Sequence, residues 1–160
     1  MSEPPPPDQR ACSCNSQHSL AVSPGTYFIK NVMTGTVIDL RANGREEGTV
    51  IESWSYVGGN NQKWKLDPSG YDQSVILRSV HANSYIWVPY QLHAQEILTK
   101  ASFTAQRWTI SSADRGFYIS PVQYPEYVLD LFHGSSAHYA KIGLWKNLQA
   151  DNQKWYFIPA

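Results

Sequence analysis

Two sets of three residues share one spacing along the chain. In each set an Asp is followed 15 residues later by a Trp, and that Trp is followed 7 residues later by an Asn. A carboxylate and an amide can hold adjacent hydroxyl groups, and an indole offers a flat apolar surface to the C–H face of a sugar ring. Hydrogen bonds to charged groups contribute about 1.5 to 3 kcal/mol, so we expect the Asp to be the largest single determinant. The pattern predicts two sites for a pyranose: Asp39, Trp54 and Asn61, and Asp130, Trp145 and Asn152.

Residues next to the first set are expected to add contacts. Glu52 and Tyr56 flank Trp54, and Gly143 stands at the position in the second set that matches Glu52. The two predicted sites therefore differ in strength. A competing interpretation is that each Asp serves a turn and each Trp the core, and the repetition of all three residue types favours binding over it.

A Gln-x-Trp motif occurs three times, with its tryptophans 44 and 47 residues apart. A period of this length indicates one supersecondary unit used three times, here at about residues 24–69, 70–113 and 114–160. Within each unit short alternating apolar segments are separated by Gly, Pro, Asn and Asp, which is typical of strands and turns. One unit alone leaves sheet edges and an apolar face uncovered, so we expect the three to pack together in an all-β domain.

The motifs also resemble a known family. The threefold Gln-x-Trp, preceded in two units by Ile38-Asp39-Leu40 and Leu129-Asp130-Leu131, is similar to the ricin B-type β-trefoil lectins, especially small single-domain fungal members, over about residues 24–160. The resemblance implies a β-trefoil of three pseudo-symmetric repeats that binds galactose or N-acetylgalactosamine glycans. The axial C4 hydroxyl of these sugars gathers their C–H groups into one apolar patch. The resemblance also implies structural roles for Gln62, Trp64, Gln106, Trp108, Gln153 and Trp155.

The middle unit departs from the pattern. Trp87 stands where the first unit has Asp39, and Ala105 precedes its Gln-x-Trp motif where the first unit has Asn61. The segment from that position to the motif's tryptophan is also shorter, at 21 residues instead of 25. We therefore predict two working sites and one degenerate unit.

The N-terminal segment differs in composition from the rest. Residues 1–22 include four consecutive prolines and predict a flexible tail, whereas residues 23–160 predict a single domain. The only cysteines, Cys12 and Cys14, lie in this tail and are expected to be reduced thiols without a metal. The chain shows no secretory signal and no apolar run of about 18 residues, which predicts a cytoplasmic protein without membrane insertion.

The balance of acidic and basic residues argues against nucleic acid as a partner. Thirteen basic residues match thirteen acidic ones, so we expect no nucleic-acid binding. We also expect no cofactor and no catalytic residues, because the histidines are scattered and the repeats occupy the chain after the tail. Two alternatives stay open: a β-trefoil protease inhibitor, and a protein-binding trefoil with inactive sugar sites. A homodimer would raise avidity for glycans on foreign cells, a role in defence that the resemblance suggests.

Overall fold

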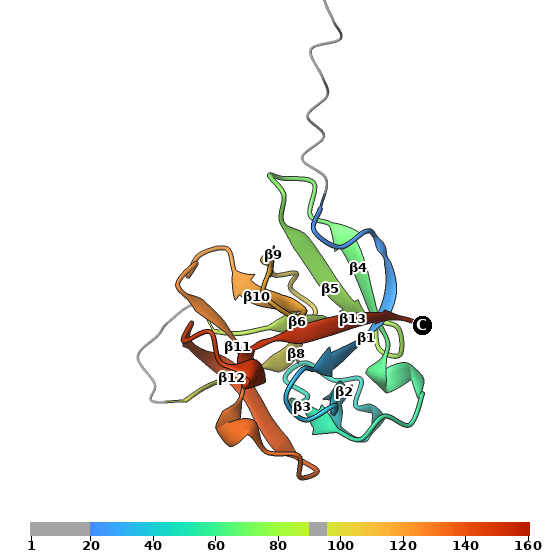
Figure 1. Cartoon of the computed structure of the whole chain (residues 1–160). Helices are drawn as coiled ribbons and strands as arrows, with labels where there is room; N and C mark the ends of the chain where they lie inside the picture. Colours follow the sequence, from blue (N-terminus) through green and yellow to red (C-terminus); the bar gives the residue numbers. More distant parts are fainter. Residues whose placement is uncertain (1–19, 90–95) are drawn as a thin grey trace, which may run out of the picture.

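The computed structural model describes residues 20–89 and 96–160, which form an all-β fold (Figure 1). Cys12 and Cys14 lie outside these residues. In the part of the chain that the structure describes, no helix combines the length and the apolar composition that a membrane span requires. The strands are β1 Gly25–Asn31, β2 Val37–Leu40, β3 Ile51–Trp54, β4 Trp64–Pro68, β5 Val75–Ser79, β6 Tyr85–Trp87, β7 Ile97–Leu98, β8 Lys100–Ser102, β9 Trp108–Ser112, β10 Phe117–Pro121, β11 Tyr127–Leu131, β12 Ala140–Lys146 and β13 Trp155–Pro159.

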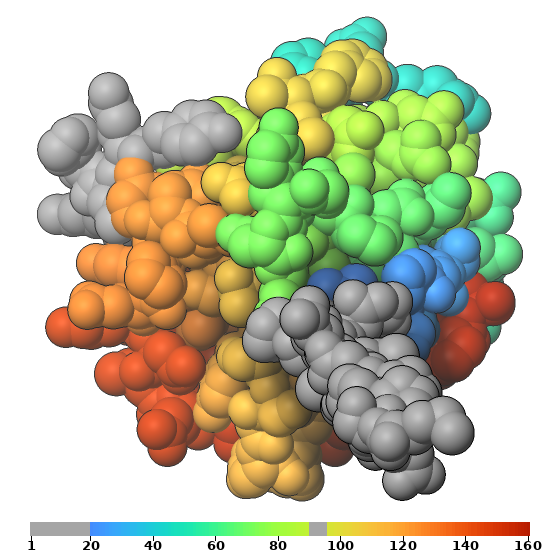
Figure 2. All heavy atoms as spheres, turned by 90° about the horizontal axis from the view of Figure 1, so that it is seen from above, coloured from blue at the N-terminus to red at the C-terminus, as the bar shows by residue number. Residues whose placement is uncertain are grey.

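Six of the strands close into a barrel. The antiparallel pairs run β1–β4, β4–β5, β5–β9, β9–β10, β10–β13 and back from β13 to β1. Each sequence unit supplies two of these six strands, and closure leaves no strand edge of the barrel unpaired. In Figure 2 the green and gold parts of the chain, from the second unit, adjoin the orange and red parts from the third.

Three hairpins, one from each unit, cover one end of the barrel. They are β2–β3, β6–β8 and β11–β12, and they meet through three equivalent pairs: Glu52 with Lys141, Leu98 with Gly143, and Lys100 with Val50. A six-stranded barrel capped by three hairpins with threefold pseudosymmetry is the β-trefoil. The predicted fold class is confirmed.

The three motif tryptophans anchor the hairpins to the core. Trp64, Trp108 and Trp155 are fully buried. Their indole Nε1 atoms donate to the carbonyl oxygens of Ile38, Ile86 and Leu129 at 3.0, 3.0 and 3.1 Å. The buried indole N–H therefore has a partner in every unit, and these bonds make Asp39, Trp87 and Asp130, each the next residue along, structurally equivalent.

The packed region begins before residue 23. Val22 is buried in the core and Leu20 packs against it. We therefore propose that the domain includes Leu20 and Val22, which the sequence boundary assigned to the tail.

Candidate functional site

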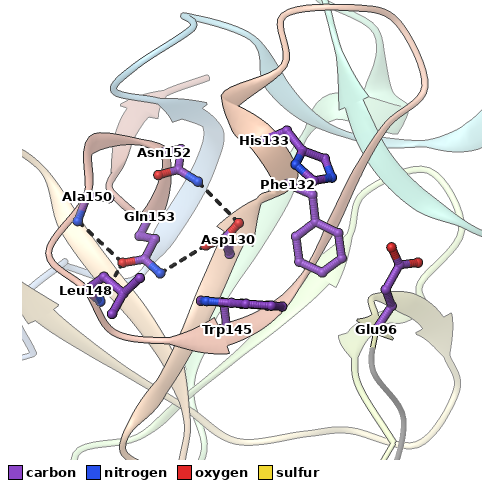
Figure 3. A pocket seen from close by; sticks show the side chains of 9 residues that line it. All are labelled: Glu96, Asp130, Phe132, His133, Trp145, Leu148, Ala150, Asn152 and Gln153. Carbon is purple, nitrogen blue, oxygen red and sulfur yellow. Dashed lines mark hydrogen bonds between the residues drawn. The ribbon is translucent and has the colours of Figure 1, made fainter.

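The third unit gathers its predicted trio around a surface hollow of about 400 Å³ (Figure 3). Asp130 comes from β11, Trp145 from β12, and Asn152 from the short 3-10 turn Asp151–Gln153 before β13. The trio is thus brought together by three elements of one unit. The other lining residues are Glu96, Phe132, His133, Leu148, Ala150 and Gln153.

Hydrogen bonds hold the carboxylate of this hollow in place. Asn152 Nδ2 donates to Asp130 Oδ1 at 3.2 Å and to the carbonyl oxygen of Leu131 at 3.0 Å. Gln153 Nε2 donates to Asp130 Oδ2 at 2.9 Å and to the carbonyl oxygen of Lys146 at 2.9 Å. Each carboxylate oxygen has lone pairs left over, so Asp130 can accept bonds from a ligand's hydroxyls without giving up its present donors.

The first unit brings its trio together in the same way. Asp39, Trp54 and Asn61 line a smaller hollow of about 260 Å³. Asn61 Nδ2 and Gln62 Nε2 both donate to Asp39 Oδ2, at 3.2 and 3.0 Å. The Asp–Asn–Gln arrangement therefore occurs twice, with both amides on one carboxylate oxygen in the first unit and on separate oxygens in the third.

The residues beneath the two hollows differ. In the first, Glu52 is buried opposite Asp39, and its carboxylate accepts a hydrogen bond from Arg41 Nε at 2.8 Å. In the third, Gly143 pairs with Asp130, and a Cβ on Gly143 would lie 2.6 Å from the Phe132 ring. The predicted equivalence of Glu52 and Gly143 holds in the strand register. The Arg41–Glu52 ion pair of the first unit thus corresponds to Phe132 and Gly143 in the third.

The aromatic surfaces also differ. Trp145 is 48% exposed, and its indole borders the hollow below Asp130 (Figure 3). Trp54 is only partly exposed, because His138 stacks on its indole with ring centroids 3.8 Å apart and 13° between the planes. Tyr139 meets the Trp54 indole edge-on at 4.7 Å. The third hollow therefore presents more free indole surface than the first.

Both carboxyl groups have raised pKa values. Burial raises the pKa of Asp39 to about 6, opposed by the hydrogen bond from Gln62 and reinforced by the nearby charge of Glu52. Burial also raises the pKa of Asp130, against the hydrogen bond from Gln153 and the charge of His133. Glu52 thus raises the pKa of the carboxyl group in the first site, whereas His133 lowers the pKa of the carboxyl group in the third.

The middle unit has lost the donor–acceptor arrangement. Trp87 takes the place of the carboxylate, and its strand partner is Lys100. Gln106 Oε1 still accepts from the backbone N–H of Val88 at 2.8 Å, but its buried Nε2 has no hydrogen-bond partner in the described part of the chain. In the other units the equivalent Nε2 donates to Asp39 or Asp130. The unpaired Nε2 of Gln106 therefore lacks the carboxylate acceptor that Gln62 and Gln153 have.

The three residues that were expected to add contacts lie in different places. Glu52 lines the first hollow, and Gly143 lies beneath Phe132 in the third. Tyr56 packs edge-on against Phe28, with ring centroids 4.7 Å apart, and lines a separate apolar hollow instead of the first-unit hollow.

Sequence reasoning missed several lining residues. Arg41 and Phe132 line the first and third hollows, and each stands two residues after the Asp of its site. An alignment of the residues that follow each Asp would have indicated both as lining residues. Tyr139 and Glu96 come from neighbouring units, and spacing within one unit carries no signal for them. No group of three His, Cys, Asp or Glu side chains that could hold a metal ion occurs within residues 20–89 and 96–160.

Comparisons with known proteins place this geometry in context. The profile of the ricin-type β-trefoil lectin domain-like family matches residues 15–96. No curated protein sequence matches significantly. Among solved structures, the Rhizoctonia solani agglutinin is 35% identical, with a TM-score of 0.83, and the match covers 89% of this chain and 99% of that one.

Two other structures show the same fold. The Macrolepiota procera ricin B-like lectin, solved with lactose, is 27% identical with a TM-score of 0.77, and the match covers 89% of this chain and 100% of that one. The C-half of an earthworm R-type lectin, solved with GalNAc, is 23% identical with a TM-score of 0.66 over 86% of this chain and 100% of that one. At that identity the earthworm protein supports the fold alone.

Proposed function

The chain belongs to the family of ricin-type β-trefoil lectin-like domains, and from this membership we propose that it binds galactose- and N-acetylgalactosamine-terminated glycans through the first-unit and third-unit hollows. Carbohydrate binding is the role that the family and its lectin members support. The two sites and their sugar are our proposal. The observation that carries it is the repeated arrangement of Asp, Asn and Trp around Asp39 and Asp130.

The geometry suits a galactose-type ring. An Asp whose oxygens are oriented by two amides presents acceptors to neighbouring hydroxyls, and the Asn that donates to it lies beside the same hollow. Trp145 supplies a half-exposed indole for the apolar patch made by C3, C4 and C5 when the C4 hydroxyl is axial. Support for galactose also comes from the Macrolepiota lectin, whose structure contains lactose, a galactose-terminated disaccharide.

Each site alone is expected to be weak. A shallow hollow with a few hydrogen bonds and one aromatic contact corresponds to a Kd of about 0.1 to 1 mM. Two sites on one rigid barrel raise avidity for a clustered glycan surface by about 100- to 10,000-fold when both can engage together. The proposed activity is therefore multivalent recognition without a catalytic step.

A glycan array combined with competition by free sugar tests this proposal. We expect binding to galactose- and N-acetylgalactosamine-terminated glycans that free lactose abolishes. The double variant Asp39→Asn plus Asp130→Asn should lose binding, since an amide accepts hydrogen bonds from hydroxyl groups on its oxygen only, whereas a carboxylate accepts them on both oxygens. Gln123→Ala, a substitution in neither hollow, serves as the folded control.

Two results would contradict the proposal. One is an array that stays blank for the wild-type protein, and the other is a double variant that binds as well as wild type. Tight inhibition of a serine or cysteine protease together with a blank array would favour the inhibitor alternative.

A further inference from the structure

Each proposed sugar site is completed by a residue from another unit: the third unit contributes one to the first site, and the second unit contributes one to the third site. Tyr139, from the loop before β12, lines the first-unit hollow, and Glu96, just before β7, lines the third-unit hollow. The strand register makes these positions equivalent, because Glu52 pairs with Lys141 while Gly143 pairs with Leu98. Tyr139 and Glu96 each lie two residues before these partners. One position in the repeat therefore reaches across the unit boundary.

The first unit has a glycine at this position. Lys100 pairs with Val50, which places Gly48 two residues earlier, facing the middle unit. Its backbone is in the left-handed region at φ 83°, and a Cβ added there would meet open space. The middle unit, which lacks the carboxylate, thus also lacks a side chain from its neighbour.

Tyr139 is held at the rim of the first hollow. It also has a left-handed backbone, at φ 64°, although it is not a glycine. Its ring stands at 81° to the Trp54 indole, and the Arg41 guanidinium carbon lies 5.3 Å from its centroid. The side chain is nevertheless 58% exposed. Two perpendicular aromatic rings therefore form a corner, with the outer ring free to contact a ligand.

We infer that Tyr139 is a ligand-contacting residue of the first site, supplied by the third unit, and that it packs against the second ring of a galactose-terminated disaccharide. This inference rests on the proposed function. The terminal galactose is held by Asp39, Asn61 and the part of the Trp54 indole that His138 does not cover. It leaves the ring of Tyr139 exposed to water. A second sugar ring covers that apolar surface.

Glu96 makes the third site different. Its carboxylate is exposed at the rim and pairs with Lys141 Nζ at 3.2 Å. It can accept a hydroxyl hydrogen bond, but it offers no ring for stacking. The third site therefore gains less from a second sugar ring than the first, and the residue at this shared position sets the difference.

Site-resolved titration tests the inference. Indole N–H signals of Trp54 and Trp145 report the two sites separately in the full-length protein. The ligands are methyl β-galactoside and lactose. We expect the first site to bind lactose about three- to tenfold more tightly than the monosaccharide, and the third site to show a smaller preference.

Substitutions then isolate the ring. Tyr139→Gly introduces the residue found at the equivalent Gly48 and suits the left-handed backbone, so we expect it to fold and to erase the lactose preference at Trp54 alone. Tyr139→Phe keeps the ring and should keep the preference. Glu96→Gly, the matched control, should change only the Trp145 response.

The outcomes separate this inference from the proposed function. If both sugars bind but Tyr139→Gly leaves the preference at Trp54 unchanged, or alters both sites equally, the role of Tyr139 is wrong and the two sites stand. If neither signal moves with either sugar, the proposed function and this inference are both overturned.

Discussion

The first-unit and third-unit hollows contain the same trio in different surroundings. In both, an Asn and a Gln orient a buried Asp beside a Trp. In the first, the Arg41–Glu52 ion pair lies beside the trio and His138 partly covers Trp54, whereas in the third Phe132 lies beside a half-exposed Trp145. The hydrogen-bonding frame thus follows the repeat, and the character of each site is set by residues outside the trio.

Removing the indole should separate the sites most strongly. Trp145→Ala is expected to weaken sugar binding at the third site about 10- to 100-fold, because this ring is its main free aromatic surface. Trp54→Ala should cost the first site less, since His138 already covers part of that ring and Tyr139 remains. Calorimetric titration with N-acetylgalactosamine in single-site backgrounds, Asp39→Asn or Asp130→Asn, measures both losses. Equal losses would contradict the comparison, and Trp145→Phe serves as the conservative control.

A methyl group at Gly143 should damage the third site. A Cβ there would lie 2.2 Å from the carbonyl oxygen of Ile97 and 2.6 Å from Phe132, so Gly143→Ala is expected to cost about 1 to 3 kcal/mol of stability. It should also displace Phe132 and weaken binding at Trp145. Urea denaturation gives the free energy of unfolding, and the Trp54 signal is the internal control. A variant as stable as wild type, with both sites intact, would show that the glycine is not required.

As the pH falls, sugar binding should weaken at the first site at a higher pH than at the third. With a pKa of about 6, the Asp39 carboxylate is ionised at pH 7.5 and is mostly protonated at pH 5, which predicts about tenfold weaker binding. Asp130 has no equivalent of Glu52 and lies near His133, so it should keep its charge to lower pH. Titrations at several pH values, read at each indole, measure this order. Glu52→Gln should lower the pH midpoint of sugar binding at the first site. If the third site lost binding at a higher pH than the first, the proposed electrostatic difference would be wrong.

The two Asp→Asn variants should differ slightly in stability at neutral pH. The raised pKa of Asp39 means that ionisation opposes folding as the pH rises through about 6, and an amide at this position removes that charge. Because both neighbouring amides donate to one oxygen of Asp39, the Asp39→Asn side chain can still accept both bonds on its single oxygen. Asp130 accepts on separate oxygens, so Asp130→Asn loses one bond.

Thermal denaturation at pH 7.5 checks this difference. Asp39→Asn should match or exceed wild type, and Asp130→Asn should be about 1 kcal/mol less stable than Asp39→Asn. The reverse order would mean that the hydrogen-bond arrangement does not govern the stability of the two variants.

Much of this arrangement could be predicted from the sequence, since the fold repeats local spacing. The Gln-x-Trp motifs are in phase with the strands, so their tryptophans reach equivalent carbonyl oxygens in all three units. The same phase predicted that Asp39 and Asn61 would meet. Tyr139 and His138 could not be predicted, because the packing of one hairpin against its neighbour brings them to Trp54. The ion pair of Glu52 likewise depends on burial, which residue type alone does not indicate.

A crystal structure with saturating N-acetylgalactosamine would show where the sugar binds. We expect one sugar in the first-unit hollow and one in the third, with hydroxyls within hydrogen-bond distance of Asp39 and Asp130, and no sugar bound at Trp87. A sugar seated elsewhere while both hollows stay empty would contradict this expectation.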